Sequence, residues 1–309
     1  MKQPTLRLTP ISALMLLALA AVWGGSFFFA EVALAEVPPL TIALHRVFWA
    51  VPCLAMLIRL RGIPLARAPR VWGAYLVMGA LNNAIPFSLI FWGQTQIESG
   101  LASILNGMTA IFGAVVAGLL LADERLTAGK IMGAVFGLAG VAVIIGPKAM
   151  YGLDPRNLAQ LAVLAGAFSY ALASVWGKTM LAGQAPQMNA LGMLTGSSVL
   201  MIPVVIWIDG VPEVGLSLPV WGALGALSVL STALAYLLYF AILVRAGAAN
   251  LMLVTLLIPP FAIALGAGVL DERLPPGALG GFALIGFALV LTDGRALARI
   301  KDILRPAKS

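Results

Sequence analysis

The chain has 309 residues, of which 61% are hydrophobic and only 10% are charged, and its mean hydropathy is +1.02. Soluble proteins carry roughly 25% charged residues, so this composition argues against a large soluble enzyme and predicts a protein of the lipid bilayer. The single cysteine, Cys53, excludes an internal disulfide.

Long apolar segments follow one another along the chain, each able to form a helix across about 30 Å of hydrocarbon. They are continuously apolar and lack the alternation of β-barrel strands. The first segment resembles a signal peptide, but its apolar stretch is too long, so we expect a retained span. The sequence therefore predicts an all-α polytopic membrane protein with ten transmembrane helices, near residues 11–30, 40–58, 71–92, 99–121, 128–146, 157–178, 187–208, 219–243, 247–269 and 276–293.

The distribution of lysine and arginine predicts the orientation of these spans. With a cytoplasmic amino terminus, Lys148, Arg156 and Arg273 fall in outer loops, Arg46 lies within a span, and the other 15 of the 19 basic residues are cytoplasmic. Because basic loops stay inside, both termini are expected in the cytoplasm. The formal charge of +7 then reflects topology and contact with anionic lipid at the cytoplasmic face, and not nucleic-acid binding.

An internal repeat divides the chain. The segment 99–126 resembles the segment 247–274, which lies 148 residues later, and the same offset carries Gly129 and Gly133 onto Gly277 and Gly281. The sequence therefore predicts two five-span repeats, 1–150 and 151–309, the second with a basic cytoplasmic tail. Since five is odd, the second repeat enters the membrane with opposite polarity, as in inverted-repeat transporters.

Three motifs resemble one known family. They are Ala21-Val22-Trp23-Gly24-Gly25-Ser26-Phe27, the His45-Arg46 pair of the second span, and the paired Asp-Glu-Arg-Leu turns at 123–126 and 271–274. These motifs resemble the EamA-type drug/metabolite transporters, and the chain is most similar to YddG-type exporters of aromatic and other amino acids. The resemblance implies export of small metabolites across the inner (plasma) membrane.

The acidic turns and the spaced glycines have structural explanations. Inversion places Asp123 and Glu124 at the cytoplasmic face and Asp271 and Glu272 outside, so the two pairs cannot share a site. We expect these acidic residues to lie at the membrane surface, where they end one helix and begin the next. A less favoured alternative is that they pair with basic residues and so hold alternate conformations. The glycines at 129, 133 and 137, with those at 277 and 281, predict close helix packing against the partner half or another chain.

Candidate binding residues are polar groups beside helix breaks in mid-span. Pro86 removes the amide that would bond the Asn82 carbonyl, next to Asn83, and breaks in matching spans of two repeats point to a midplane site. In the ninth span Pro259 and Pro260 free carbonyls in the same way, and the corresponding part of the fourth span holds Asn106 and Gly107. Each break is equally explained as a packing kink or as part of a binding site.

Aromatic side chains at bilayer depth are candidates for a cavity wall, because an indole or phenol there seeks a polar partner. Trp23, Tyr170 and Tyr239 are favoured, and Trp49, Trp176 and Tyr236 are further candidates. Walls rich in such rings suit amphipathic or aromatic solutes.

Arg46 is the sharpest local signal, because a buried arginine in a span costs about 2.5–3.5 kcal/mol on insertion scales. One interpretation is recognition of a substrate carboxylate by its planar guanidinium. The alternative is that it snorkels to the outer surface or pairs with Glu31, Glu36 or Glu98. His45 is a further candidate, although a lone histidine is more often a packed one.

The sequence predicts an inner-membrane exporter of small amphipathic solutes, amino acids including aromatic ones, working by alternating access through a central cavity. Alternatives are a multidrug or organic cation efflux carrier and, in another class, a membrane sensor or scaffold. One histidine, one cysteine and no acidic pair within a span argue against an enzyme or metal site. No Walker motif is present, so neither ATP nor a cofactor is expected, and the chain is expected as monomer or homodimer.

Overall fold

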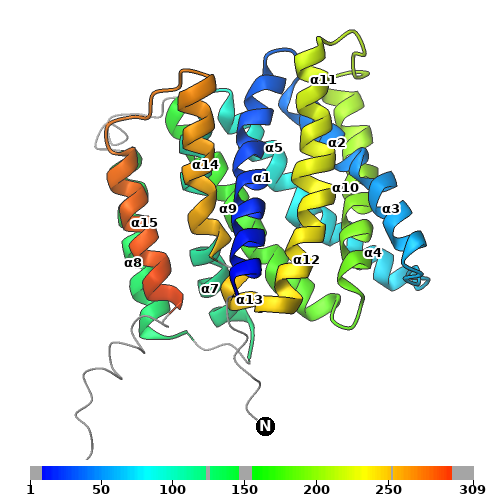
Figure 1. Ribbon diagram of the computed structural model, residues 1–309, viewed down its shortest axis with the longest axis horizontal. Coiled ribbons are helices and arrows are strands. Elements are labelled where there is room, and N and C mark those ends of the chain that lie inside the picture. Colours follow the sequence, from blue (N-terminus) through cyan, green and yellow to red (C-terminus); the bar gives the residue numbers. More distant parts are fainter. Residues whose placement is uncertain (1–8, 123–125, 146–154, 252, 294–309) are drawn as a thin grey trace, which may run out of the picture.

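The computed structural model describes residues 9–122, 126–145, 155–251 and 253–293. Within these ranges the chain is helical and has no strand (Figure 1). The elements are α1 (Pro10–Leu34), α2 (Pro39–Phe48), α3 (Ala50–Leu60), α4 (Pro69–Gly79), η1 (Ala80–Ala84), α5 (Ile85–Gln94), α6 (Ser99–Asn106), α7 (Met108–Leu120), α8 (Ala128–Ile145), α9 (Pro155–Met180), α10 (Pro186–Ile208), α11 (Leu218–Gly225), η3 (Ala226–Leu234), α12 (Ala235–Ala246), α13 (Ala248–Leu251), α14 (Val254–Val269) and α15 (Ala278–Asp293).

In this described part, eight helical segments are long and apolar enough to cross a membrane. The helices Val254–Val269 and Ala278–Thr292 are also apolar but shorter, and they occupy the positions expected for the ninth and tenth spans. Large apolar side chains such as Leu14 and Trp207 are exposed, as contact with lipid requires. The all-helical, polytopic class is thus confirmed, whereas the count of ten spans stays a prediction.

Helices α8 and α15 lie side by side at one edge of the bundle (Figure 1). Their contact is built on glycine: a Cβ on Gly281 would lie 2.6 Å from the carbonyl oxygen of Gly140, and a Cβ on Gly133 would lie 2.8 Å from that of Ala288. Lipid gives helices no hydrophobic reason to associate, so such close backbone contact supplies the packing energy. The packing role predicted for the spaced glycines is confirmed for this pair of helices.

The other contacts recur in pairs along the chain. α1 packs along α14, and α9 packs along α6 and α7; α5 packs on α9, and α12 packs on α1. The 148-residue offset relates α6 and α7 to α13 and α14, and α5 to α12, so each contact has a counterpart of the kind an inverted repeat produces.

Wide π-helical turns interrupt two segments at corresponding positions. η1 and η3 separate α4 from α5 and α11 from α12, and the 148-residue offset places residues 80–84 onto 228–232, inside η3. Such turns release backbone groups from the regular ladder and are frequent at functional sites. The break predicted beside Pro86 is present as η1, since α5 begins at Ile85 directly after it.

The prolines of the last long segments need a correction. Pro259 and Pro260 lie inside α14, which begins earlier, at Val254, and runs on through them to Val269. In the fourth predicted span, Gly107 separates α6 from α7, as predicted. Neighbouring helices at membrane depth let a helix continue through proline, so the residue type alone does not locate the break.

Candidate functional site

A cavity of about 510 Å³ lies at the centre of the bundle. Its wall is mostly apolar, and its aromatic members come from α1, α5, α9 and α12. They are Trp23, Phe27, Phe87, Phe91, Tyr170, Tyr236, Tyr239 and Phe240. The polar members are Ser26, Arg46, Asn82, Ser103, Asn106, Thr109, Asn189, Ser231, Thr232 and Thr255.

Arg46 enters this cavity from the last turn of α2 and is only 7% exposed. Its Nε donates to Thr232 Oγ1 at 3.2 Å, and its Nη2 donates to the carbonyl oxygen of Ser231 at 3.4 Å. Both acceptors belong to η3, whose irregular backbone presents that carbonyl. A guanidinium has five N–H donors, so these two long bonds leave most of them without a protein partner in the described part of the chain.

An aromatic ring supports the same guanidinium from one side. Arg46 Cζ lies 4.0 Å from the centroid of the Phe87 ring and 5.9 Å from that of Phe91. A desolvated cation over a ring is stabilised by about 2 kcal/mol, which offsets part of the cost of burying the charge. The Phe87 and Tyr170 rings also pack edge to face, with centroids 6.4 Å apart.

The alternative prediction, that Arg46 reaches the outer surface or pairs with a nearby glutamate, is wrong. Glu31 accepts a hydrogen bond from Gln94 at 3.3 Å, Glu36 accepts one from the amide of Ser217 at 2.8 Å, and Glu98 pairs with Arg156. Among the described residues, no acidic side chain forms an ion pair with Arg46. The side chain turns inward because η3 and Phe87 offer it partners there.

The amide of Asn82 is weakly held within the cavity. Its Nδ2 lies 3.5 Å from each of three acceptors, namely Asn83 Oδ1, Met193 Sδ and the Tyr236 hydroxyl. An N–H···O hydrogen bond is best near 2.9 Å, so none of these contacts fixes the amide strongly. Asn82 can therefore turn toward a bound molecule at small cost.

Trp23, Asn106 and Tyr239 complete the group of predicted residues that meet in the cavity. The Trp23 and Tyr239 rings are 6.0 Å apart and tilted by 44°. Asn106 stands at the α6 end before Gly107, where its carbonyl accepts a 2.7 Å bond from Thr109. The structure thus brings together Trp23, Arg46, Asn82, Asn106, Tyr170, Tyr236 and Tyr239, with Gly107 in the same wall.

Other predicted residues lie outside the cavity lining. His45 accepts a 2.9 Å bond from the indole of Trp49, which is 46% exposed, and Asn83 is fully buried and donates to Ser197 at 3.4 Å. Trp176 donates to the carbonyl of Ala74 at 3.0 Å and borders a separate shallow groove. Neighbours on an α-helix point about 100° apart, so His45 lies off the wall that Arg46 joins, and in η1 Asn83 packs against Ser197 while Asn82 lines the cavity.

Some functional residues of the cavity were not predicted from the sequence, among them Ser231, Thr232, Phe87 and Phe91. Ser231 and Thr232 carry no proline or charge nearby that marks a break. The 148-residue offset places Ser231 on Asn83, however, and applying it to the third and eighth spans would have pointed to η3. Phe87 and Phe91 are one helical turn apart beyond Pro86, which is the spacing of neighbours on one face.

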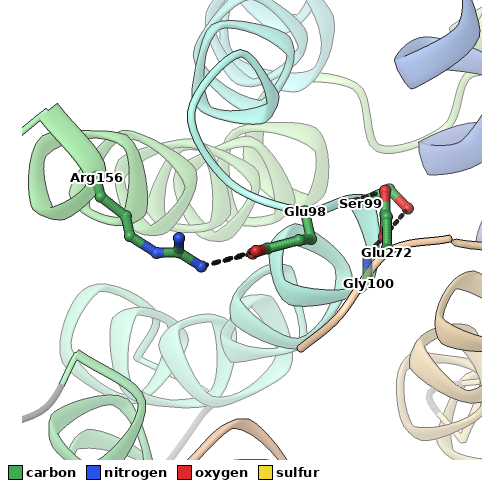
Figure 2. Close-up of polar contacts among 5 residues, drawn as sticks. All are labelled: Glu98, Ser99, Gly100, Arg156 and Glu272. Carbon is green, nitrogen blue, oxygen red and sulfur yellow. Dashed lines mark hydrogen bonds and ion pairs between the residues drawn. The ribbon is translucent and has the colours of Figure 1, made fainter. Parts of the chain in front are cut away.

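At one end of the bundle, above the cavity, acidic side chains connect segments that are distant in the sequence. Glu98 pairs with Arg156 at 2.7 Å, and the Glu272 carboxylate accepts bonds from the Ser99 amide, the Ser99 hydroxyl and the Gly100 amide (Figure 2). A carboxylate at a helix amino terminus satisfies free N–H groups and the helix dipole. Glu272 thus has a structural role, as predicted, but it caps the distant helix α6 and does not end α14 or begin α15. Asp123 and Glu124 lie outside the described residues.

Two further contacts join distant segments at the same end. Asp209 accepts bonds from the amide and the hydroxyl of Thr41, at 3.1 and 2.7 Å. Glu36 accepts the 2.8 Å bond from the Ser217 amide, and hydrogen bonding by the hydroxyl and the amide of Ser217 lowers the pKa of its carboxyl group. All four contacts link residues before 146 to residues after 154. The cavity begins one helical turn below these four contacts, and it extends to Pro186, Leu243 and Leu251 near the other end of the bundle.

Among the described residues, no group of three His, Cys, Asp or Glu side chains could hold a metal ion.

Comparison with known proteins places the chain among transporters. The model of the EamA-like transporter family matches residues 10–146 and 157–292. The uncharacterized transporter YvbV of Bacillus subtilis is 29% identical, with 93% of each chain covered. The uncharacterized inner membrane transporter YedA of Escherichia coli K12 is 26% identical, with 94% of each covered. A probable terminal-alkyne amino-acid exporter of Streptantibioticus cattleyicolor is 25% identical, covering 93% of this chain and 94% of that one.

A solved structure described only as a crystal structure of a protein has the same fold. It superposes with a TM-score of 0.66 at 21% identity, and the match covers 94% of this chain and 99% of the other.

Proposed function

The chain belongs to the EamA-like transporter family, and from that membership we propose that it exports small amphipathic solutes that carry a carboxylate, amino acids with apolar or aromatic side chains among them. It is a multi-pass protein of the inner membrane. Membership in a transporter family agrees with the absence of enzymatic chemistry expected from the sequence.

Arg46 carries this proposal. It places a permanent positive charge, with unused N–H donors, in the wall of a central cavity whose other walls are largely aromatic and aliphatic. A planar guanidinium matches a carboxylate with two parallel hydrogen bonds. Rings such as Trp23 and Tyr239 suit the apolar part of the same solute.

Transport proceeds by alternating access between two inverted repeats, 1–150 and 151–309. Two observations support this mechanism: helix contacts and π-helical turns recur with the repeat offset, and polar contacts join the two repeats at the end above the cavity. With both termini cytoplasmic, this joined end is the outer face, these contacts keep it closed, and the cavity is loaded from the cytoplasm. Release outside requires those contacts to open.

Efflux is driven by the solute gradient. Among the described residues that line the cavity, none is an aspartate or glutamate that could relay a proton or bind sodium. Flux that keeps its dependence on a pH gradient after the membrane potential is clamped would contradict this proposal.

Two alternatives make different predictions. An organic cation carrier requires a cavity that attracts positive charge, and Arg46 in the wall opposes this. A sensor or scaffold requires no flux, so transport of a radiolabelled solute by proteoliposomes distinguishes it directly from an exporter.

Substitution of Arg46 tests the proposed site. In proteoliposomes loaded with labelled aromatic amino acid, we expect Arg46→Ala to lower efflux at least tenfold, because the loss of a charged hydrogen-bonding partner removes about 1.5–3 kcal/mol. Arg46→Lys should restore part of the flux, since it keeps the charge without the planar fork.

Arg245 provides the matched control. It lies in the last turn of α12 and outside the cavity lining, so Arg245→Ala should transport at the wild-type rate. Wild-type flux in an Arg46→Ala protein that elutes as a single folded species in detergent would overturn the role of Arg46.

A further inference from the structure

The charges around the cavity carry an inference about which carboxylates it prefers. We propose that the cavity selects monoanions, so that an apolar monocarboxylate without an ammonium group binds better than the corresponding amino acid. This inference rests on the proposed function and narrows its solute class.

The first step is the charge of the wall. Among the described residues that line the cavity, Arg46 is the only charged side chain. The other polar members are hydroxyls and amides, such as Asn82, Asn106 and Thr232. The described wall of the cavity therefore carries one net positive charge, and none of its other side chains neutralises that charge.

The second step is the state of that charge. The groups that contact the guanidinium are the Thr232 hydroxyl, the Ser231 carbonyl and two phenyl rings, all of them neutral. Burying a charge costs free energy unless the charge is paired and its donors are hydrogen-bonded. A bound carboxylate supplies both the missing charge and the missing acceptors, so the complex with a monoanion is neutral.

The third step concerns an ammonium group in the same space. The nearby acids are already engaged: Glu31 with Gln94, Glu98 with Arg156, and Glu272 with the α6 amino terminus. None of them lines the cavity. An ammonium would lose its water, gain only neutral acceptors such as the Asn82 carbonyl, and be repelled by Arg46. A zwitterion is therefore penalised and an amine is rejected.

Three probes with the same phenyl group separate these effects. They are 3-phenylpropionate, L-phenylalanine and phenethylamine, which carry a carboxylate alone, both charges, and an ammonium alone. Titration of the purified protein in detergent, followed by tryptophan fluorescence, gives the affinity for each. We expect 3-phenylpropionate to bind about tenfold more tightly than L-phenylalanine, and phenethylamine not to bind.

A variant that adds the missing acid should reverse the order. In Asn82→Asp the new carboxylate faces the cavity and can pair with an ammonium, so L-phenylalanine should now bind more tightly than 3-phenylpropionate. Asn82→Ala removes the amide without adding charge, and it should keep the wild-type order. Asn106→Asp provides a second acidic variant should the first not fold.

The outcomes separate this inference from the proposed function. If L-phenylalanine binds as tightly as 3-phenylpropionate and Arg46→Ala abolishes both, the function stands and selection for monoanions is refuted. If neither carboxylate binds while phenethylamine does, the proposed carboxylate site itself fails. If the order is the same in Asn82→Asp and Asn82→Ala, charge does not set the preference and the inference is overturned.

Discussion

Adjacent residues in this bundle face different surroundings. His45 and Arg46 share the last turn of α2, yet Arg46 faces the cavity while His45 packs against Trp49 and Trp221. Asn82 and Asn83 divide in the same way, one toward the cavity and one toward Ser197. A residue type suited to binding is therefore informative only together with the side of the helix on which it lies.

A single glycine in the α8 and α15 contact tests how close that packing is. An added Cβ at Gly281 would meet Ile144 and the Gly140 carbonyl oxygen, so Gly281→Ala must push the two helices apart. We expect a loss of about 1–3 kcal/mol, the range for overpacked sites, measured as a lower melting temperature in detergent.

Gly280 is the natural control for this substitution. It is the neighbouring residue in α15, but a Cβ there would lie 3.9 Å from its nearest contact. Gly280→Ala should melt at or slightly above the wild-type temperature, because alanine favours the helix. Equal melting of both variants would show that α8 and α15 are not packed through glycine.

At the scale of elements, the ends of helices join segments that are distant in sequence. The turn before α15 supplies Glu272, which caps α6, and the first turn of α9 supplies Arg156 for Glu98 (Figure 2). The proposed alternating access requires such contacts to break during each cycle, so weakening them should favour the state that is open outside.

Glu272→Gln tests whether the contact of Glu272 with the α6 amino terminus holds the outer end closed. The amide cannot supply the charge that Ser99 and Gly100 now share, so the cap weakens. Ser103 is buried, lines the cavity and lies one turn below, so Ser103→Cys in a Cys53→Ser background reports opening. We expect faster labelling by an impermeant maleimide from outside when Glu272→Gln is added.

The control for the latch is another acidic residue at the same end. Glu213 is exposed and has no hydrogen-bond partner among the described residues, so Glu213→Gln should leave the labelling rate of the reporter unchanged. Identical rates in the two variants would mean that Glu272 does not hold the outer end closed.

At the scale of the whole molecule, orientation decides which face loads the cavity. The distribution of basic residues predicts that the 209–217 loop lies outside and the 181–185 loop inside. In the Cys53→Ser background, an impermeant thiol reagent added to intact spheroplasts should label Gly215→Cys and should not label Ala182→Cys until the membrane is opened. The reverse pattern would invert the proposed direction of transport.

Much of this architecture was predictable. Apolar segments of membrane length predicted the helical bundle, and Pro86 located η1. The glycine spacing predicted close packing without naming the partner helix, which the structure shows to be α15 for α8. Pro259 and Pro260 wrongly predicted a helix break, because a helix packed among other helices can continue through proline. The π-helical turn η3 could not be predicted, because no proline or charge marks it in the sequence. The partners of Arg46 were also hidden, since Ser231 and Thr232 lie more than 180 residues away in sequence.

The sequence by itself determined that this chain is a helical membrane protein and that an arginine within one of its spans requires stabilising partners or a function. These properties follow from composition and from the cost of a charge in hydrocarbon, which are both independent of partners. Only the tertiary structure decided that Arg46 turns inward, away from Glu31, Glu36 and Glu98. The reason is that a side chain settles where its hydrogen-bond acceptors and supporting rings are, and these come from η3 and α5, which meet α2 only in the folded bundle.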